Sequence, residues 1–349
     1  MENKVKDLTV TDRYAIYNSD CMEVIPTLGE NSIDLVMYSP PFANLYTYSS
    51  SERDMSNVSS NEEFLQQYEY LVKELARVTK KGRINAIHCT DLFKYNGALS
   101  DFPSEIIKLH EKHGFTYMSR ITIWKEPLRV RLKTMVQSLM HKFIVEDSTK
   151  NYPAMPDYIL LFKKKGENEI PVTHPFGLTH YAGTTPILPE TVGIYNRANN
   201  SDFKSGAELW DYICKKYENH DDATTNKKSH IIWQRYASAV WDDIRAENCM
   251  PYHDAKEEDD EKHVTPTQLD VLDRIVDLYS NHDEVVLTPF MGVGSDVFSP
   301  VSMGRKAIGI ELKDSYYKQA VKNLAEVKSR FATVDKQVSM FDEIEDSES

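Results

Sequence analysis

The sequence predicts an α/β protein whose mostly parallel sheet is covered by helices on both faces. Short apolar runs that end in turn residues alternate with longer segments in which apolar residues recur at helical spacing. This alternation runs over residues 1–165 and returns after the acidic stretch 254–262. Strands that alternate with helices are joined by crossover connections, which place the strands in parallel and the helices on both faces. With 349 residues, 41% of them hydrophobic, the chain can form one large or two modest domains.

The first group of expected elements lies within residues 14–165. Helices are expected over 61–82, where Asn61 can cap the start and Gly82 can end the helix, and over 103–115. The expected strands are 14–20, 32–39, 83–88, 118–124 and 157–165.

Residues 166–250 show weak periodicity, and 230–244 is their one cohesive segment. A long irregular region in a compact protein is usually functional or disordered, and the Trp and Tyr side chains of this one favour order. Beyond it the pattern predicts helix 265–280, strand 283–290, a glycine turn followed by a helix, strand 306–312 and helix 314–331.

Composition excludes several classes of protein. No apolar run is long enough to cross a bilayer, and the N-terminal MENKVKDLTV lacks the apolar core of a signal peptide. The four cysteines are far apart without a CxxC pair, and the histidines show no metal-ligand spacing. We therefore expect a cytoplasmic protein with no membrane contact, no disulfide framework and no metal.

The net charge of −13 disfavours nucleic acid as a partner, because phosphate contacts require Lys and Arg. However, the acidic residues concentrate in 254–262 and in the tail 341–349, which we expect to be solvated and mobile. DNA needs only a local basic surface, and residues 124–142 are rich in Lys and Arg. Candidate DNA-backbone contacts are Lys125, Arg129, Arg131 and Lys133, the alternative being an ordinary solvated face.

A glycine turn marks a candidate nucleotide site in 287–312. Gly292 and Gly294 follow a strand and precede a helix, so the backbone can approach a ligand closely, and Glu311 ends the next strand, where an acid can accept from both ribose hydroxyls. The turn lacks a third glycine and any basic residue, which favours a ligand with a ribose but no phosphate, such as S-adenosylmethionine. The alternative is a generic turn with a surface glutamate.

A second candidate site is Ser39-Pro40-Pro41-Phe42, at the end of strand 32–39. Two prolines make a stiff extended segment, so the Ser39 hydroxyl and the Pro40 carbonyl can accept two hydrogen bonds from one aromatic NH₂ group while Phe42 stacks on its ring. The nitrogen lone pair is then aimed at a methyl sulfonium, and catalysis is positioning plus electrostatics without a metal, covalent intermediate or strong base. The alternative is an edge-strand turn with incidental prolines.

These segments together resemble the DNA methyltransferases that modify exocyclic amino groups. Ser39-Pro40-Pro41-Phe42 resembles their catalytic motif, and TPFMGVGS (288–295) resembles their S-adenosylmethionine motif Asp-Pro-Phe-x-Gly-x-Gly. The segments 17–42 and 262–276 resemble two further family motifs, and the catalytic motif precedes the cofactor motif as in the permuted β class. The cofactor contacts that the resemblance implies are Asp20, Cys21, Thr265, Thr267, Pro289, Phe290, Gly292, Gly294, Ser295 and Glu311.

The resemblance also implies an architecture: a doubly wound, seven-stranded Rossmann-like sheet, circularly permuted, with an inserted target-recognition region. The expected division is a catalytic half (1–165), a variable recognition region (166–250), a cofactor-binding half (251–331) and an acidic tail (332–349). Double-stranded DNA is the implied partner, with a homodimer and a cognate restriction enzyme as further possibilities. The target base must be flipped out of the duplex to reach the pocket.

Three positions depart from the family pattern: Thr288 replaces the acid before Pro-Phe, and Pro266 and Gln268 stand where the family has Gln and Pro. Tyr46 and Tyr48 either line the pocket or pack, whereas Trp241 is expected in the core and His263 in a structural role.

Ser-Pro-Pro favours N4 of cytosine as the methylated amine, and N6 of adenine stays open. The rivals are a methyltransferase for protein amides or small amines, a non-catalytic nucleotide- or DNA-binding module and, more distantly, a dehydrogenase.

Overall fold

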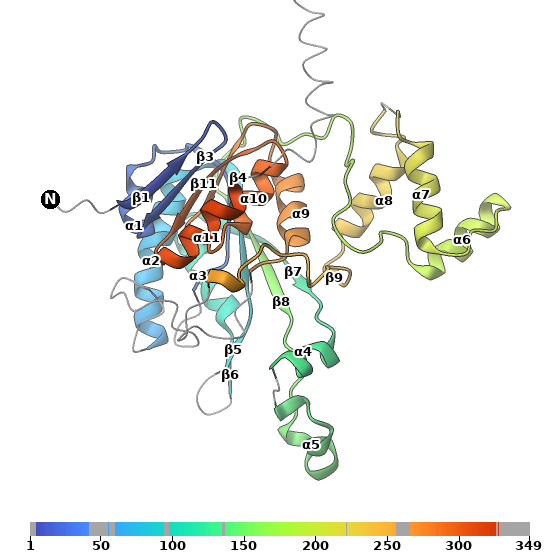
Figure 1. Ribbon diagram of the computed structural model, residues 1–349, viewed down its shortest axis with the longest axis horizontal. Helices are drawn as coiled ribbons and strands as arrows, with labels where there is room; N and C mark the ends of the chain where they lie inside the picture. Colours follow the sequence, from blue (N-terminus) through green and yellow to red (C-terminus); the bar gives the residue numbers. More distant parts are fainter. Residues whose placement is uncertain are drawn as a thin grey trace, which may run out of the picture.

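The computed structural model describes residues 5–41, 55, 60–93, 98–134, 137–220, 222–255, 266–325 and 327. Within these ranges, nine strands form one mixed sheet in the order β1-β2-β11-β10-β3-β4-β8-β7-β9 (Figure 1). Its strands are β1 (Val5–Val10), β2 (Tyr14–Ser19), β3 (Ile33–Tyr38), β4 (Thr79–Cys89), β7 (Phe115–Ile123), β8 (Asp157–Lys164), β9 (Val240–Trp241), β10 (Val285–Thr288) and β11 (Lys306–Glu311). A separate two-stranded ladder joins β5 (Leu92–Phe93) to β6 (Leu99–Ser100).

The centre of the sheet is parallel, as the sequence predicted. Strands β2, β11, β10, β3 and β4 run parallel, and β8 pairs antiparallel with both β4 and β7. The α/β class is thus confirmed, and the seven expected strands form the middle of the sheet. The edge strand β1 was not expected, because VKDLTV is largely exposed and shows no apolar face. The two-residue β9 pairs with β7 at the other edge.

Both faces of the sheet are buried. Along β3, Val36 and Tyr38 pack on one face while Leu35 and Met37 pack on the other, as the two-residue period of a strand dictates. The first face is covered by α1 (Cys21–Val24), α2 (Asn61–Val78) and α3 (Phe102–Lys112). The second face is covered by α9 (Leu269–Tyr279), α10 (Ser295–Ser302) and α11 (Asp314–Leu324).

Helix α2 differs from the expected 61–82 at both ends. Ser60 caps it instead of Asn61, since its hydroxyl accepts from the Glu63 amide at 3.1 Å. The helix ends at Val78 because the chain passes directly into β4. Gly82 lies within β4 at φ +73°, where a Cβ would come within 2.6 Å of Asn168. The expected helix 314–331 is observed as far as Leu324, and most of its last turns lie outside the described residues.

Residues 166–250 contain more regular structure than the sequence indicated. Helices α6 (Pro189–Asn199), α7 (Gly206–Lys216) and α8 (Lys227–Tyr236) project from one side of the sheet (Figure 1). Inside this projection Ile187, Val192, Leu209 and Ile213 form a small apolar core. The helical periodicity of α6–α8 is weak in the sequence because a core this small needs few apolar positions per helix.

A buried arginine attaches this projection to the sheet. Arg274 on α9 donates to the Ala182 carbonyl at 2.8 Å and to both Asp243 oxygens at 2.8 Å. Its guanidinium also lies 4.9 Å from the ring centre of Trp241, which is fully buried, as expected of a core residue.

A second projection extends from the end of β7 and carries α4 (Pro127–Thr134) and α5 (His141–Glu146) (Figure 1). None of the helices that the structure describes is long and apolar enough to cross a membrane.

Candidate active site

A pocket of about 220 Å³ lies at the carboxyl ends of the parallel strands. Several of its lining residues directly follow β2, β3, β10 and β11, the edge where open α/β sheets bind ligands. The lining residues are Ser19, Asp20, Cys21, Ser39, Pro40, Pro41, Met55, His88, Tyr252, Pro266, Thr267, Pro289, Phe290, Met291, Gly292, Val293, Ser295, Asp296, Glu311, Leu312, Lys313 and Tyr316.

The two sites expected from the sequence open into this one pocket. Ser39, Pro40 and Pro41 line it together with eight of the ten expected cofactor contacts: Asp20, Cys21, Thr267, Pro289, Phe290, Gly292, Ser295 and Glu311. Gly294 does not line the pocket and is instead the N-cap of α10, with φ +95°. Phe42, Tyr46, Tyr48, His263 and Thr265 lie outside the described residues.

The glycine turn is held by Glu311. One carboxylate oxygen of Glu311 accepts from the Gly292 amide at 2.9 Å, and the other accepts from the Lys313 amide at 2.8 Å. Gly292 has φ +54°, a left-handed conformation that favours glycine, and a Cβ there would meet nothing within 4 Å. The strand end, the turn and the acid therefore form one rigid wall of the pocket.

Asp20 and Cys21 also line the pocket, where they directly follow β2, the strand that pairs with β11. Asp20 caps α1 by accepting from the Met22 amide at 2.9 Å. Burial, with the charge of Asp20 beside it, raises the pKa of the Cys21 thiol. Cys21 is therefore an apolar wall residue and not a nucleophile.

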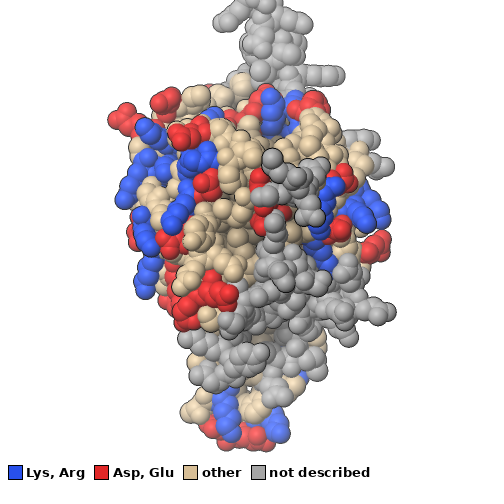
Figure 2. Space-filling model, turned by 90° about the vertical axis from the view of Figure 1, so that its left-hand side faces the viewer, with Lys and Arg blue, Asp and Glu red and all other residues tan. Residues whose placement is uncertain are grey.

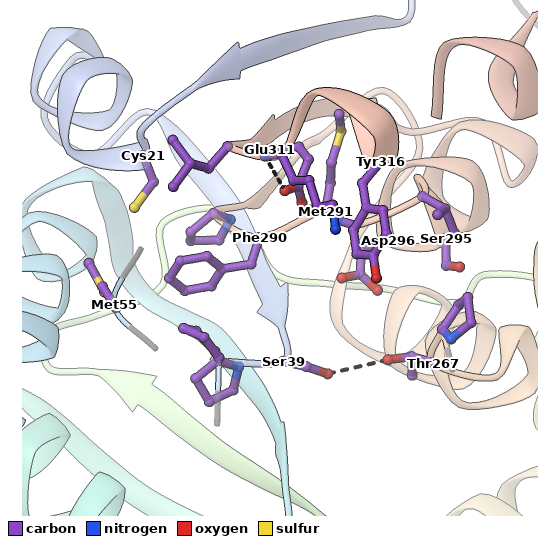
Figure 3. Close-up of a pocket in the computed structure, with 18 of the residues that line it drawn as sticks. Cys21, Ser39, Met55, Thr267, Phe290, Met291, Ser295, Asp296, Glu311 and Tyr316 are labelled. Atoms are coloured by element: carbon purple, nitrogen blue, oxygen red, sulfur yellow. Dashed lines mark hydrogen bonds between the residues drawn. The ribbon is translucent and has the colours of Figure 1, made fainter. Parts of the chain in front are cut away.

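Ser39 lies at the centre of a polar chain that sequence reasoning missed. Its hydroxyl is 2.8 Å from His88 Nδ1 and 3.3 Å from the Thr267 hydroxyl (Figure 3 shows the second contact). On the far side of the imidazole, Asp157 Oδ2 lies 3.3 Å from His88 Nε2, and Lys125 Nζ lies 2.6 Å from Asp157 Oδ1. The available signal was a His at the end of one apolar run and an Asp at the start of another.

A buried carboxylate, Asp296, was also missed. Burial raises its pKa to about 7, and the Thr288 hydroxyl, 3.3 Å away, partly opposes this. Of the residues that the structure describes, Thr288 is its one hydrogen-bond partner. The neighbouring Ser295 hydroxyl is buried with no hydrogen-bond partner in the described part of the chain. Both residues face the pocket across from Cys21 and Met55 (Figure 3).

The four candidate DNA contacts lie on or beside α4. Lys125 is paired with Asp157, and Arg129 forms an ion pair with Glu247. Arg131 is half-buried, and the side chain of Lys133 is outside the described part. Among the described residues on the face that carries β1, positive and negative side chains are interspersed (Figure 2), so the described part of that face forms no uniformly basic track for DNA. DNA contact by these residues stays a prediction.

Comparison with known proteins identifies a family whose sequence model matches most of this chain. The sequence model of a family described as DNA methylase, covering N6 and N4 methyltransferases, matches residues 33–322. The type II methyltransferase M.BamHI of Bacillus amyloliquefaciens is 24% identical over 321 residues, which are 92% of this chain and 60% of the relative. The chain therefore spans well under the full length of that relative.

Two solved structures share the fold. TTHA0409 from Thermus thermophilus, assigned as a DNA modification methylase, superposes with a TM-score of 0.55 at 19% identity, covering 91% of this chain and 96% of that one. TTHA0409 has also been solved in complex with S-adenosyl-L-methionine. The cytosine-N4-specific PvuII DNA methyltransferase superposes with a TM-score of 0.50 at 16% identity, covering 89% and 86%. At such identities the likeness shows the fold alone.

Proposed function

Because the chain belongs to the N6/N4 DNA methylase family, we propose that it transfers the methyl group of S-adenosyl-L-methionine to an exocyclic amino group in double-stranded DNA. One observation carries this proposal: Ser39-Pro40-Pro41 and the Gly292 turn, far apart in the sequence, line the same pocket. That pocket allows an aromatic amine and a sulfonium methyl to be held side by side, and proximity of this kind supplies much of the rate of a direct transfer.

The pocket has polar groups suited to each part of the cofactor. Glu311, oriented by two backbone amides, would accept from the ribose hydroxyls. Asp20, beside Cys21, would take the adenine end. When bound, the cofactor supplies an electrophilic methyl on a positively charged sulfur.

The methionine end of the cofactor would lie near Ser295 and Asp296. A buried carboxylate whose one hydrogen-bond partner among the described residues is a neutral hydroxyl is best satisfied by a cation, and the cofactor's α-ammonium is one. The family pattern has an acid at the position of Thr288, and Asp296 would supply the carboxylate that is missing there.

The amine would be held by the Ser39 hydroxyl and the Pro40 carbonyl, with Phe42 stacking on the flipped base. We favour N4 of cytosine, with N6 of adenine as the alternative; the preference rests on Ser-Pro-Pro alone. We further propose that residues 166–250, which carry α6–α8, read the target sequence, between the catalytic half 1–165 and the cofactor half 251–331. A homodimer and a cognate restriction enzyme are the further partners that the family resemblance implies.

Methyl transfer from tritiated S-adenosylmethionine to duplex DNA tests this proposal. We expect label on DNA, recovered as N4-methylcytosine after digestion and mass spectrometry, and loss of that label in Ser39→Ala. Label recovered as N6-methyladenine would correct the base, whereas label on protein or on a small amine, with none on DNA, would refute the DNA assignment.

A further inference from the structure

From Ser39, the series of polar contacts continues through three side chains that the proposed reaction does not use: His88, Asp157 and Lys125. We propose that Asp157 and His88 set the direction of the Ser39 hydroxyl, so that it accepts a hydrogen bond from the target amine, and that His88 then receives the proton which this amine loses. This inference rests on the proposed function. His88 acts through Ser39 and is a positioning residue.

Asp157 determines which nitrogen of His88 carries the proton. Although burial opposes its ionisation, the Lys125 ammonium 2.6 Å away and His88 hold the pKa of Asp157 well below its usual range. A carboxylate only accepts hydrogen bonds, so the imidazole nitrogen that faces it must be the protonated one. Nε2 is buried and lies 3.3 Å from Asp157 Oδ2, an ion-pair distance without hydrogen-bond alignment. Such contacts often tighten when substrate binds.

The direction of the Ser39 hydroxyl follows. With the proton on Nε2, Nδ1 is an acceptor, and the Ser39 hydroxyl 2.8 Å away donates to it. The oxygen lone pairs of Ser39 then face the pocket and accept from an NH₂ group. With the opposite tautomer, Nδ1 would donate to Ser39, and the Ser39 proton would point at the amine. The Thr267 hydroxyl, 3.3 Å from both atoms, supports either arrangement and does not choose between them.

The same series of side chains, from Ser39 to His88 and Asp157, provides a route for the departing proton. The amine lone pair forms the N–CH₃ bond while the S–CH₃ bond breaks, and its electron pair stays on sulfur, which becomes a neutral thioether. The cationic methylated nitrogen gives one N–H proton to Ser39 as Ser39 passes its own proton to His88 Nδ1. The resulting imidazolium faces the Asp157 carboxylate, as in other Ser-His-Asp arrangements.

Asp157→Asn tests the inference, because Lys125 determines which way the new amide group faces. The ammonium attracts the amide oxygen, so the amide NH₂ faces Nε2, moves the imidazole proton to Nδ1 and reverses Ser39. We expect kcat to fall about 100-fold, within the range of lost acid–base assistance, with unchanged KM for DNA and unchanged affinity for S-adenosylhomocysteine.

Two second-site variants separate positioning from a structural role. Adding Lys125→Met to Asp157→Asn frees the amide to turn its oxygen toward Nε2, and kcat should recover by at least about tenfold. In a His88→Ala background, Asp157→Asn should have little further effect on kcat. Lys142→Met, the same change on the second projection at an exposed lysine, is the matched control and should not restore kcat to Asp157→Asn.

The inference is overturned if Asp157→Asn lowers kcat equally with and without His88, or if Lys125→Met brings no recovery. Thermal melts of each variant identify a loss that comes from unfolding, and the Lys125→Met double variant keeps the test valid because it leaves no uncompensated ammonium. If the parent protein transfers no methyl group to DNA, the proposed function fails before any variant is compared.

Discussion

Asp296→Asn is the substitution whose consequences the structure defines most fully. Asp296 is 5% exposed, its folded pKa is about 7 against 3.8 for an ordinary Asp, and Thr288 is its one hydrogen-bond partner among the described residues. Asn has the same shape and can still accept from Thr288, so the change removes the charge and little else. The ligand-free protein should gain stability, whereas the cofactor complex should lose affinity.

The sign follows from proton linkage. Because the folded carboxyl binds its proton more tightly than the unfolded one, Asp296 costs nothing well below pH 3.8, and its cost grows as the pH rises through 3.8 to about 7. At about 1.4 kcal/mol per pKa unit, Asp296→Asn should raise the free energy of unfolding by roughly 1.5 kcal/mol at pH 5 and up to roughly 4 kcal/mol at pH 8.

Urea denaturation of both proteins at pH 5 and pH 8 measures this difference, and other titrating groups cancel in the comparison. Calorimetry supplies the second measurement. S-adenosylhomocysteine should bind the variant about 10- to 100-fold more weakly, the worth of a hydrogen bond to a charged group. Methylthioadenosine, which lacks the amino-acid end, should bind both proteins equally. A stability difference that is the same at both pH values, or equal losses for the two ligands, would refute the reasoning.

Three further predictions concern other parts of the molecule. Glu311→Gln should weaken S-adenosylhomocysteine and methylthioadenosine alike by about tenfold or more in the same calorimetric assay, because both carry the ribose that this carboxylate would hold; a loss confined to one ligand would contradict this role. Gly309→Ala should lower the free energy of unfolding by about 1–3 kcal/mol in urea, since the added Cβ would lie 2.5 Å from Val297 Cγ2 and 2.6 Å from Met291 Sδ; a change under about 0.5 kcal/mol would show that β11 and α10 adjust freely. Arg274→Met should cost about 3–5 kcal/mol, because it leaves Asp243 buried without its principal cation. Hydrogen exchange in α6–α8 should rise in this variant, and unchanged protection there would indicate that the projection is held by its own small core.

Local signals in the sequence were enough to predict the α/β class, most strands of the sheet and the residues of both halves of the pocket. Apolar period and turn residues mark strands such as 32–39, two prolines stiffen the segment after Ser39 whatever surrounds it, and the glycine turn requires a left-handed φ at Gly292. Even so, the two sites meet in one pocket only because parallel strands end at the same edge of the sheet.

Only the folded molecule shows which polar side chains meet. His88 reaches Asp157 because β4 and β8 pair antiparallel in a register that sets His88 opposite Ile159. Asp296 reaches Thr288 because α10 packs against β10, and Arg274 holds the projection that carries α6–α8 through Asp243 and Ala182. Such contacts depend on strand register and helix packing, which are set by the whole core at once, so no short stretch of sequence carries them.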